Sequence, residues 1–134
     1  MTLTGGCLCG TARYQVEGEI GEAGICHCKN CQRQSGTAFS VNIAVQRRDV
    51  TLSGELKTFV DSSDSGEEVL RRFCANCGSP LFSELPRYPD LIVIKTGTLD
   101  DTSEIKPTFE VWTKRKQCWV AFDHTYPSFV ENSR

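Results

Sequence analysis

The chain has 134 residues, 39% of them hydrophobic, with 15 basic and 17 acidic side chains and a formal net charge of −2. This balance provides no positive excess that would draw the whole chain onto nucleic acid or an anionic membrane. The length suits one domain that buries its own core, so we expect residues 1–134 to form a single domain.

The amino-terminal residues Met-Thr-Leu-Thr-Gly-Gly contain no basic group and no apolar run of signal-peptide length. No later stretch approaches the roughly 20 apolar residues of a membrane-spanning helix. Cysteines grouped at short spacing in a reducing compartment indicate metal binding or catalysis rather than disulfides. We therefore expect a cytoplasmic protein without a membrane partner.

Alternating apolar residues separated by turn residues predict a mainly β fold with no long amphipathic helix. Residues 11–16 place Ala12, Tyr14 and Val16 on one face, and residues 38–45 also place alternate apolar side chains on one face. Further strands are predicted at residues 50–52, 56–60, 69–73, 81–85, 91–96 and 109–112.

Two segments in this series stand out by composition. Residues 61–66 are the most polar part of the chain, which is typical of a mobile loop bordering a site. Residues 91–94, Leu-Ile-Val-Ile, form an unbroken apolar run. Such a run predicts a strand that is covered on both faces.

Seven of the eight cysteines fall into three tight groups. They are Cys7 with Cys9, then Cys26 with Cys28 and Cys31, and finally Cys74 with Cys77. Cysteines this close in sequence can direct their sulfurs to one point about 2.3 Å away, the zinc–sulfur distance. A disulfide instead requires Cβ atoms about 4 Å apart and a constrained torsion.

The first and last groups together predict a closed zinc site. Cys74 and Cys77 precede Gly78 in a Cys-x-x-Cys-Gly knuckle, in which the glycine lets backbone amides turn toward the sulfurs. Cys7 and Cys9 are the expected partners, so the metal would join the start of the chain to its middle and stabilise the fold. The alternative is that one pair is simply buried as apolar thiols.

The central group predicts a different kind of site. Cys26, Cys28 and Cys31 supply three sulfurs from one short segment. Three protein ligands leave one coordination position for water or substrate, which is the mark of a catalytic zinc. Cys118, His27 or His124 is the alternative fourth ligand of a closed site. We expect Cys118 to be a small buried hydrophobe and His27 to form a hydrogen bond behind the metal.

Three segments that contain these cysteines resemble the signatures of the glutathione-dependent formaldehyde-activating enzyme family, which includes centromere protein V. They are residues 5–14 (GGCLCGTARY), 26–39 (CHCKNCQRQSGTAF) and 72–82 (RFCANCGSPLF). The resemblance implies a β-tent fold of short antiparallel sheets clamped by two zinc ions per chain. The implied ligands are Cys7, Cys9, Cys74 and Cys77 at a structural zinc and Cys26, Cys28 and Cys31 at a catalytic-type zinc.

The resemblance also implies carbon–sulfur lyase chemistry, in which glutathione adds to formaldehyde to give S-hydroxymethylglutathione, or the reverse. The expected partner is thus a small thiol such as glutathione, with no nucleic acid. Near the central cysteines, Lys29 and Arg33 are the candidate groups for the thiol's carboxylates, and Gly36 would permit close approach. Two alternatives stay open: a non-catalytic zinc-stabilised binding module, and a thiol reductase resembling methionine sulfoxide reductases that uses Cys118.

Overall fold

The computed structural model describes residues 2–63, 65–122 and 125–132. These residues form strands, one α-helix and three 3-10 helices, the latter at Arg47–Asp49, Thr96–Thr98 and Thr113–Arg115. The other elements are β1 (Thr2–Gly6), β2 (Arg13–Glu17), β3 (Ala23–Cys26), α1 (Lys29–Ser35), β4 (Ser40–Gln46), β5 (Val50–Ser53), β6 (Leu56–Ser62), β7 (Glu68–Cys74), β8 (Pro80–Glu84), β9 (Leu91–Lys95) and β10 (Pro107–Val111).

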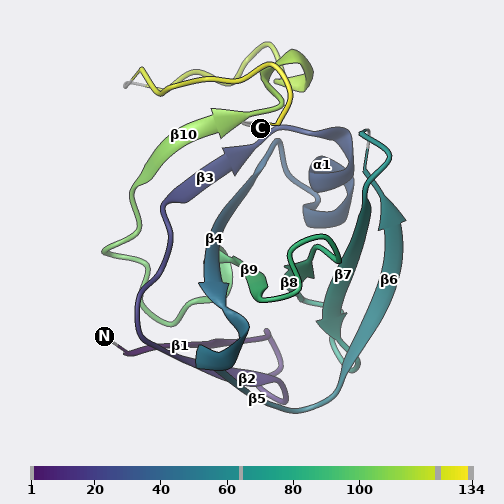
Figure 1. Cartoon of the computed structure of the whole chain (residues 1–134), viewed down its shortest axis with the longest axis vertical. Helices are drawn as coiled ribbons and strands as arrows, with labels where there is room; N and C mark the ends of the chain where they lie inside the picture. Colours follow the sequence, from purple (N-terminus) through teal and green to yellow (C-terminus); the bar gives the residue numbers. More distant parts are fainter. Residues whose placement is uncertain (1, 64, 123–124, 133–134) are drawn as a thin grey trace.

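The strands form two sheets. A three-stranded sheet has the order β1-β2-β5, and a seven-stranded sheet has the order β10-β3-β4-β9-β8-β7-β6. Every pair of neighbouring strands is antiparallel except β10 and β3, which are parallel. The larger sheet curls, so that β10 and β3 stand opposite β7 and β6, while the smaller sheet lies at one end and α1 at the other (Figure 1). The mainly β prediction is confirmed.

One face of the large sheet packs against the small sheet to form the main core. Ile43 of β4, Ile94 of β9 and Phe82 of β8 belong to the same buried cluster as Tyr14 and Val16 of β2. The rings of Tyr14 and Phe82 meet edge to face with centroids 5.1 Å apart. The alternation predicted for residues 11–16 is thus confirmed, because every second side chain of β2 enters this core.

The opposite face of the large sheet, which we name the site face, is built from the intervening residues. Cross-strand pairs bring together residues from distant parts of the chain, since side chains that are directly opposite share a face. Its members are Phe109 and Val111 of β10, Gly24 and Cys26 of β3, Asn42 and Ala44 of β4, Leu91, Val93 and Lys95 of β9, Ser83 of β8, and Val69 and Arg71 of β7.

This arrangement corrects the prediction for residues 91–94. Ile92 and Ile94 are buried in the core, but Leu91 and Val93 are only half-buried and border a cavity on the site face. The apolar run therefore has one face in a packed core and the other in a binding cavity. The predicted loop at residues 61–66 is also shorter than expected, because β6 continues through Ser62.

The helix α1 was missed because seven residues are too short to show an amphipathic stripe. Cys28 caps its amino terminus, and its sulfur accepts a hydrogen bond from the Cys31 backbone N–H at 3.2 Å. Gly36 ends the helix in the left-handed conformation (φ 69°), and its N–H donates to the carbonyl of Gln32. Gly36 is therefore required for this turn, because left-handed backbone strains residues with a Cβ. The helix holds the central cysteines in a fixed local geometry.

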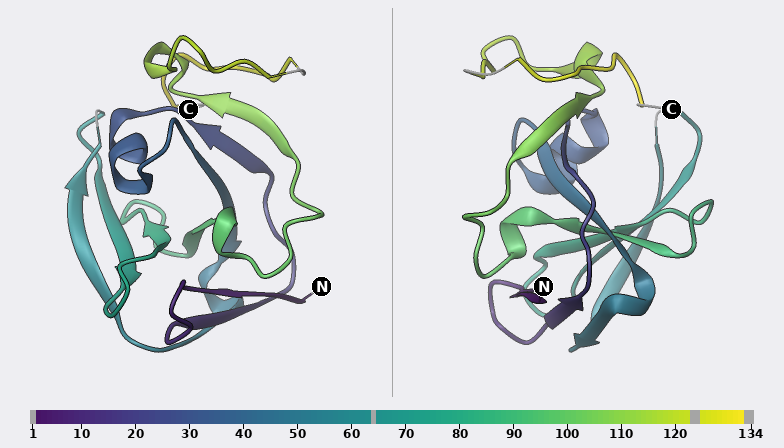
Figure 2. Two further views of the ribbon diagram at one scale, coloured as in Figure 1. Left: turned by 180° about the vertical axis from the view of Figure 1, so that it is seen from behind. Right: turned by 60° about the vertical axis from the view of Figure 1, so that its left-hand side comes forward.

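The carboxyl-terminal segment returns along β10. The N–H of Glu110 donates to Pro127 at 2.9 Å, and that of Phe129 donates to the Glu110 carbonyl at 3.0 Å. This pairing places residues 127–129 beside β10, at the end of the molecule opposite to β1 (Figure 2). No helix in the described ranges is long and apolar enough to cross a membrane.

Candidate metal centres

The first candidate centre joins the small sheet to the β7–β8 turn. The Sγ atoms of Cys7, Cys9, Cys74 and Cys77 all lie within 4.8 Å of one another. Cys7 and Cys9 have sulfurs 3.5 Å apart, and those of Cys9 and Cys74 are 3.8 Å apart. The pairing predicted between the first and last cysteine groups is therefore brought about by the fold.

Hydrogen bonds to two of these sulfurs, those of Cys9 and Cys77, favour the thiolate form. The hydroxyl of Ser79, 3.2 Å from Cys77 Sγ, lowers the pKa of Cys77 to about 5. Thr11 Oγ1, 3.0 Å from Cys9 Sγ, lowers the pKa of Cys9 to about 7. The backbone N–H of Cys77 also donates to Cys74 Sγ at 3.4 Å. Thiolate sulfurs supported in this way are suited to a metal ion.

The second candidate centre lies where β3 meets α1. Cys26, Cys28 and Cys31 also place their sulfurs within 4.8 Å of one another, and in the described part of the chain no fourth cysteine, histidine or carboxylate joins the group. Trp112, which directly follows β10, packs against Cys28 and Cys31. The thiols of Cys26 and Cys28, together with the charge of Lys95, hold the pKa of Cys31 far below its usual range.

Two buried cations on the site face approach this group. Arg71 is 4% exposed, and its Nη1 donates to Cys31 Sγ at 3.8 Å while Nε donates to Asp61 Oδ2 at 3.0 Å. Lys95 is 8% exposed and donates to Asn42 Oδ1 at 3.0 Å. Burial lowers the pKa of Lys95, and the negative charge of Cys31 opposes this shift. Such cations stabilise a cluster of thiolates electrostatically.

Behind the second centre lies a buried polar chain. His27 Nε2 donates to Glu110 Oε1 at 2.8 Å, and Lys116 Nζ donates to the same oxygen at 3.1 Å. These hydrogen bonds outweigh the effect of burial and keep the pKa of Glu110 below its usual value. The hydrogen bond predicted for His27 is present, while its role behind a metal ion stays a prediction.

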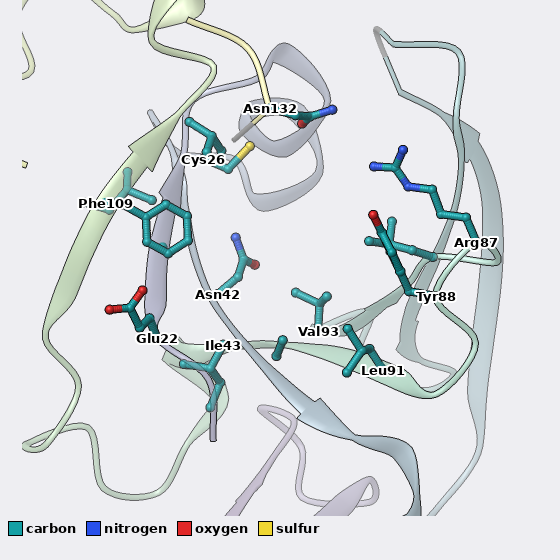
Figure 3. A pocket seen from close by; sticks show the side chains of 15 residues that line it. Glu22, Cys26, Asn42, Ile43, Arg87, Tyr88, Leu91, Val93, Phe109 and Asn132 are labelled. Carbon is teal, nitrogen blue, oxygen red and sulfur yellow. The ribbon is translucent and has the colours of Figure 1, made fainter. Parts of the chain in front are cut away.

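Two cavities meet at the second centre. The smaller, about 160 Å³, is lined by the three cysteines, by Arg71 and Lys95, and by Ser83. The larger, about 440 Å³, begins at Cys26 and extends along the site face (Figure 3). Cys26 and Val93 are among the residues that line both, so the cavities adjoin.

The sequence-predicted substrate contacts lie elsewhere. Lys29 and Arg33 are exposed on α1, and Gly36 is its exposed end. None of the three is among the lining residues of the two cavities. Cys118 is exposed rather than buried, and it belongs to neither cysteine group. His124 lies outside the described residues.

Several residues of the site were not found from the sequence. Lys95 could have been noticed, because it is the charged residue of the otherwise apolar strand β9, whereas Arg71 did not stand out because β7 also contains other charged residues. Asn132 had no signal in the sequence. It reaches both cavities through the return of the chain along β10, where its Oδ1 accepts a 2.7 Å hydrogen bond from Trp112 Nε1. The polar residues 63 and 65 also border the smaller cavity, as expected for this loop.

The fold and the two cysteine groups define a class: a mainly β protein with two positions that could each hold a metal ion. The family model for glutathione-dependent formaldehyde-activating enzymes matches residues 2–115. The chain therefore belongs to this family, and the resemblance in its three cysteine segments is confirmed.

One relative agrees with this assignment, and one solved structure shares the fold. A protein of Halomonas elongata, named provisionally as a glutathione-dependent formaldehyde-activating enzyme, is 25% identical over 131 residues, which cover 92% of this chain and 82% of that protein. A crystal structure of a Rhodobacter sphaeroides protein superposes with a TM-score of 0.59 at 21% identity, covering 78% of this chain and 99% of that chain. The second likeness concerns the fold alone.

Proposed function

We propose that the chain is a zinc-dependent carbon–sulfur lyase that makes or breaks the bond between a small thiol, such as glutathione, and an aldehyde carbon. The observation that carries the proposal is the group of Cys26, Cys28 and Cys31, which opens into a cavity beside buried cations. Membership of a formaldehyde-activating family supports the same reaction class.

The first cysteine group suits a structural zinc. Four sulfurs at the corners of a tetrahedron with zinc–sulfur bonds of about 2.3 Å lie about 3.8 Å apart. The sulfur separations of 3.5 Å for Cys7–Cys9 and 3.8 Å for Cys9–Cys74 agree with that spacing. We propose that Cys7, Cys9, Cys74 and Cys77 hold one zinc ion and that Cys26, Cys28 and Cys31 hold a second.

We propose a structural role for the first zinc ion and a catalytic role for the second, because they have different numbers of protein ligands. Four thiolates close the shell of the first zinc, whereas three leave one position of the second zinc to water or substrate. A bound zinc would lower the pKa of an entering thiol and fix the direction of its sulfur. Three thiolates already overcompensate the two charges of the ion, which favours thiol chemistry over the activation of water for hydrolysis.

The reaction requires the protein to transfer one proton and to stabilise the negative charge that develops on oxygen and sulfur. When a hemithioacetal breaks, the carbon–sulfur electron pair stays with sulfur, the hydroxyl oxygen becomes the aldehyde carbonyl, and its proton passes to the thiol. The addition reverses these steps. The protein therefore has to stabilise a developing oxygen anion and a thiolate at the same time.

The smaller cavity contains groups suited to both charges. Ser83 lines this cavity and is only 5% exposed. Its Oγ has no hydrogen-bond partner among the described residues. Ser83 lies opposite both Arg71 and Val93 in the sheet, and Lys95 follows two residues after Val93. We assign Ser83 and Lys95 to the oxygen of the substrate and Arg71 to the charge of the thiolate group.

A non-catalytic binding module would need the cysteines only as a scaffold. The cavity beside the three cysteines and the buried Oγ of Ser83, which is unpartnered in the described part of the chain, argue against that alternative, since a scaffold requires neither. We propose in addition that residues 1–134 form one domain and work in the cytoplasm. The eight cysteines are all free, as expected in a reducing compartment.

The proposed function is tested by following carbon exchange between free aldehyde and its glutathione adduct by NMR magnetisation transfer. Zinc-loaded protein should accelerate exchange above the buffer rate, and Cys31→Ser should remove the acceleration. Absence of acceleration with every aldehyde tried, formaldehyde and benzaldehyde included, would refute the lyase assignment.

The same assay separates the lyase from the reductase alternative. A reductase of the methionine sulfoxide type would depend on a metal-free cysteine, and Cys118 is the only one outside the two groups. Cys118→Ser should therefore retain full exchange activity. Loss of activity in this variant, with both metals still bound, would favour the reductase.

A further inference from the structure

The larger cavity has the dimensions of a ligand site. Its volume of about 440 Å³ falls within the roughly 300–1,000 Å³ of small-molecule pockets. Cys26 lies at one end, while Glu22 lies at the far end and is exposed to solvent (Figure 3). A substrate whose sulfur is held by the central cysteines would therefore have its neighbouring substituents at the mouth of this cavity.

The cavity wall is mainly apolar. Ala44, Leu91 and Val93 form its floor on β4 and β9, and the ring of Phe109 projects into it from β10 (Figure 3). Gly24 makes room for that ring, because a Cβ at this position would lie 2.4 Å from Phe109 Cζ. The position of the aromatic ring is thus built into the pairing of β3 with β10.

Three polar side chains of the wall, those of Asn42, Arg87 and Asn132, already have partners in the protein. Asn42 accepts from Lys95 at 3.0 Å and donates to Ser40 at 2.9 Å. Arg87 pairs with Glu67 at 3.4 Å and lies over the ring of Tyr88.

Asn132 uses its carbonyl oxygen to accept from Trp112. The outer carboxylate of Glu22 would repel an anion. Glutathione has two carboxylates and an ammonium group, and their desolvation in such surroundings would be costly.

The two cavities therefore suit different halves of one adduct. The smaller cavity, with Arg71, Lys95 and Ser83, suits the sulfur and oxygen of a polar thiol adduct. The larger suits a hydrocarbon group, whose burial contributes about 25 cal/mol for each Å² removed from water.

We propose that the larger cavity holds the aldehyde-derived substituent, so that this chain acts on glutathione-type adducts of aromatic or aliphatic aldehydes in preference to the formaldehyde adduct. This inference rests on the proposed carbon–sulfur lyase function. The bond changes are those given above, with an apolar substituent in place of hydrogen on the reacting carbon.

The first test uses 4-fluorobenzyl alcohol, which has the apolar group but neither thiol nor aldehyde, as a fluorine NMR probe of the zinc-loaded protein. It should bind to the wild type, and Ala44→Leu, which fills the cavity, should weaken binding by about tenfold or more. The matched control Ala121→Leu makes the same substitution at an exposed position outside both cavities and should leave binding unchanged. Absence of binding, or equal binding to both variants, would overturn the inference.

The second test compares exchange of 4-fluorobenzaldehyde and formaldehyde with glutathione. We expect kcat/KM to favour the aromatic aldehyde by about tenfold or more, and we expect Ala44→Leu to abolish that preference while Ala121→Leu retains it. If Ala44→Leu is unstable, Leu91→Glu at the outer part of the cavity should have the same effect. Equal or greater activity with formaldehyde would overturn the inference but leave the lyase function standing, whereas no exchange with either aldehyde would refute the lyase function itself.

Discussion

His27 and Glu110 form a buried hydrogen bond of 2.8 Å that connects the segment between two candidate metal ligands to the edge strand β10. Glu110 is also bonded to Lys116 and to Ser128, so its carboxylate is shared by three donors from separate parts of the chain. The positions of Cys26 and Cys28, on either side of His27, therefore depend on a contact with residues more than eighty positions away.

Removing this carboxylate should destabilise the protein. Glu110→Ala leaves a buried histidine and a partly buried lysine without their acceptor, so we expect a loss of about 3 kcal/mol in the free energy of unfolding. Glu110→Gln keeps the shape and one acceptor and should cost about 1 kcal/mol. Urea unfolding of metal-loaded protein measures both, with the exposed Glu104→Ala as control. A Glu110→Ala protein as stable as this control would contradict the structural role of the pair.

The two cysteine groups should differ in metal retention. Metal analysis of protein purified without chelator should give about two zinc ions per chain, and the second should be lost first because it has three protein ligands. Cys31→Ser should keep the fold and lose that labile zinc, while Cys77→Ser should fail to fold stably. Equal destabilisation of the two variants would mean that Cys26, Cys28 and Cys31 are structural ligands, and the lyase proposal would fall with them.

Lys95 should strengthen metal binding by the central cysteines through its positive charge. Lys95→Met removes the charge but keeps an unbranched side chain on the site face, so we expect about 10- to 100-fold weaker zinc binding at the second site. Competition with a chromophoric chelator measures this affinity. Lys57→Met, an exposed position on β6, is the control. The electrostatic role would be excluded by unchanged affinity in the Lys95 variant.

Tyr14 should make the stability depend on alkaline pH. Burial raises the pKa of Tyr14 from 10.0 to about 12, so its folded-state pKa exceeds the unfolded value. Its stabilising contribution is therefore complete below pH 10 and is lost as the pH rises toward 12, with about 1 kcal/mol lost between pH 9 and pH 11.

Tyr14→Phe provides the comparison for this prediction. The variant lacks the 2.7 Å hydrogen bond to Thr98 and should be about 1 kcal/mol less stable than wild type at pH 9. By pH 11 the two proteins should be nearly equal in urea unfolding. A constant difference between them across this range would show that Tyr14 does not titrate in the folded protein as expected.

Much of the site could be predicted from the sequence because it is local. Cysteines separated by one or two residues must lie near one another whatever the fold, and the glycine after Cys77 indicates the turn that directs amides to sulfur. The strands were likewise predictable from alternation, since side chains two residues apart share a face. The parallel pairing of β10 with β3 and the short helix α1 had no comparable local pattern.

The sequence alone determined the three cysteine groups with the spacing of metal ligands, the family and the mainly β character, because each depends on residues that are neighbours along the chain. Only the tertiary structure decided that Arg71, Ser83 and Lys95 face Cys31 and that Phe109 enters an apolar cavity beside Cys26. These groups come from four different strands. Their meeting depends on the order and register of those strands in the sheet, and hydrogen bonds between distant segments set both.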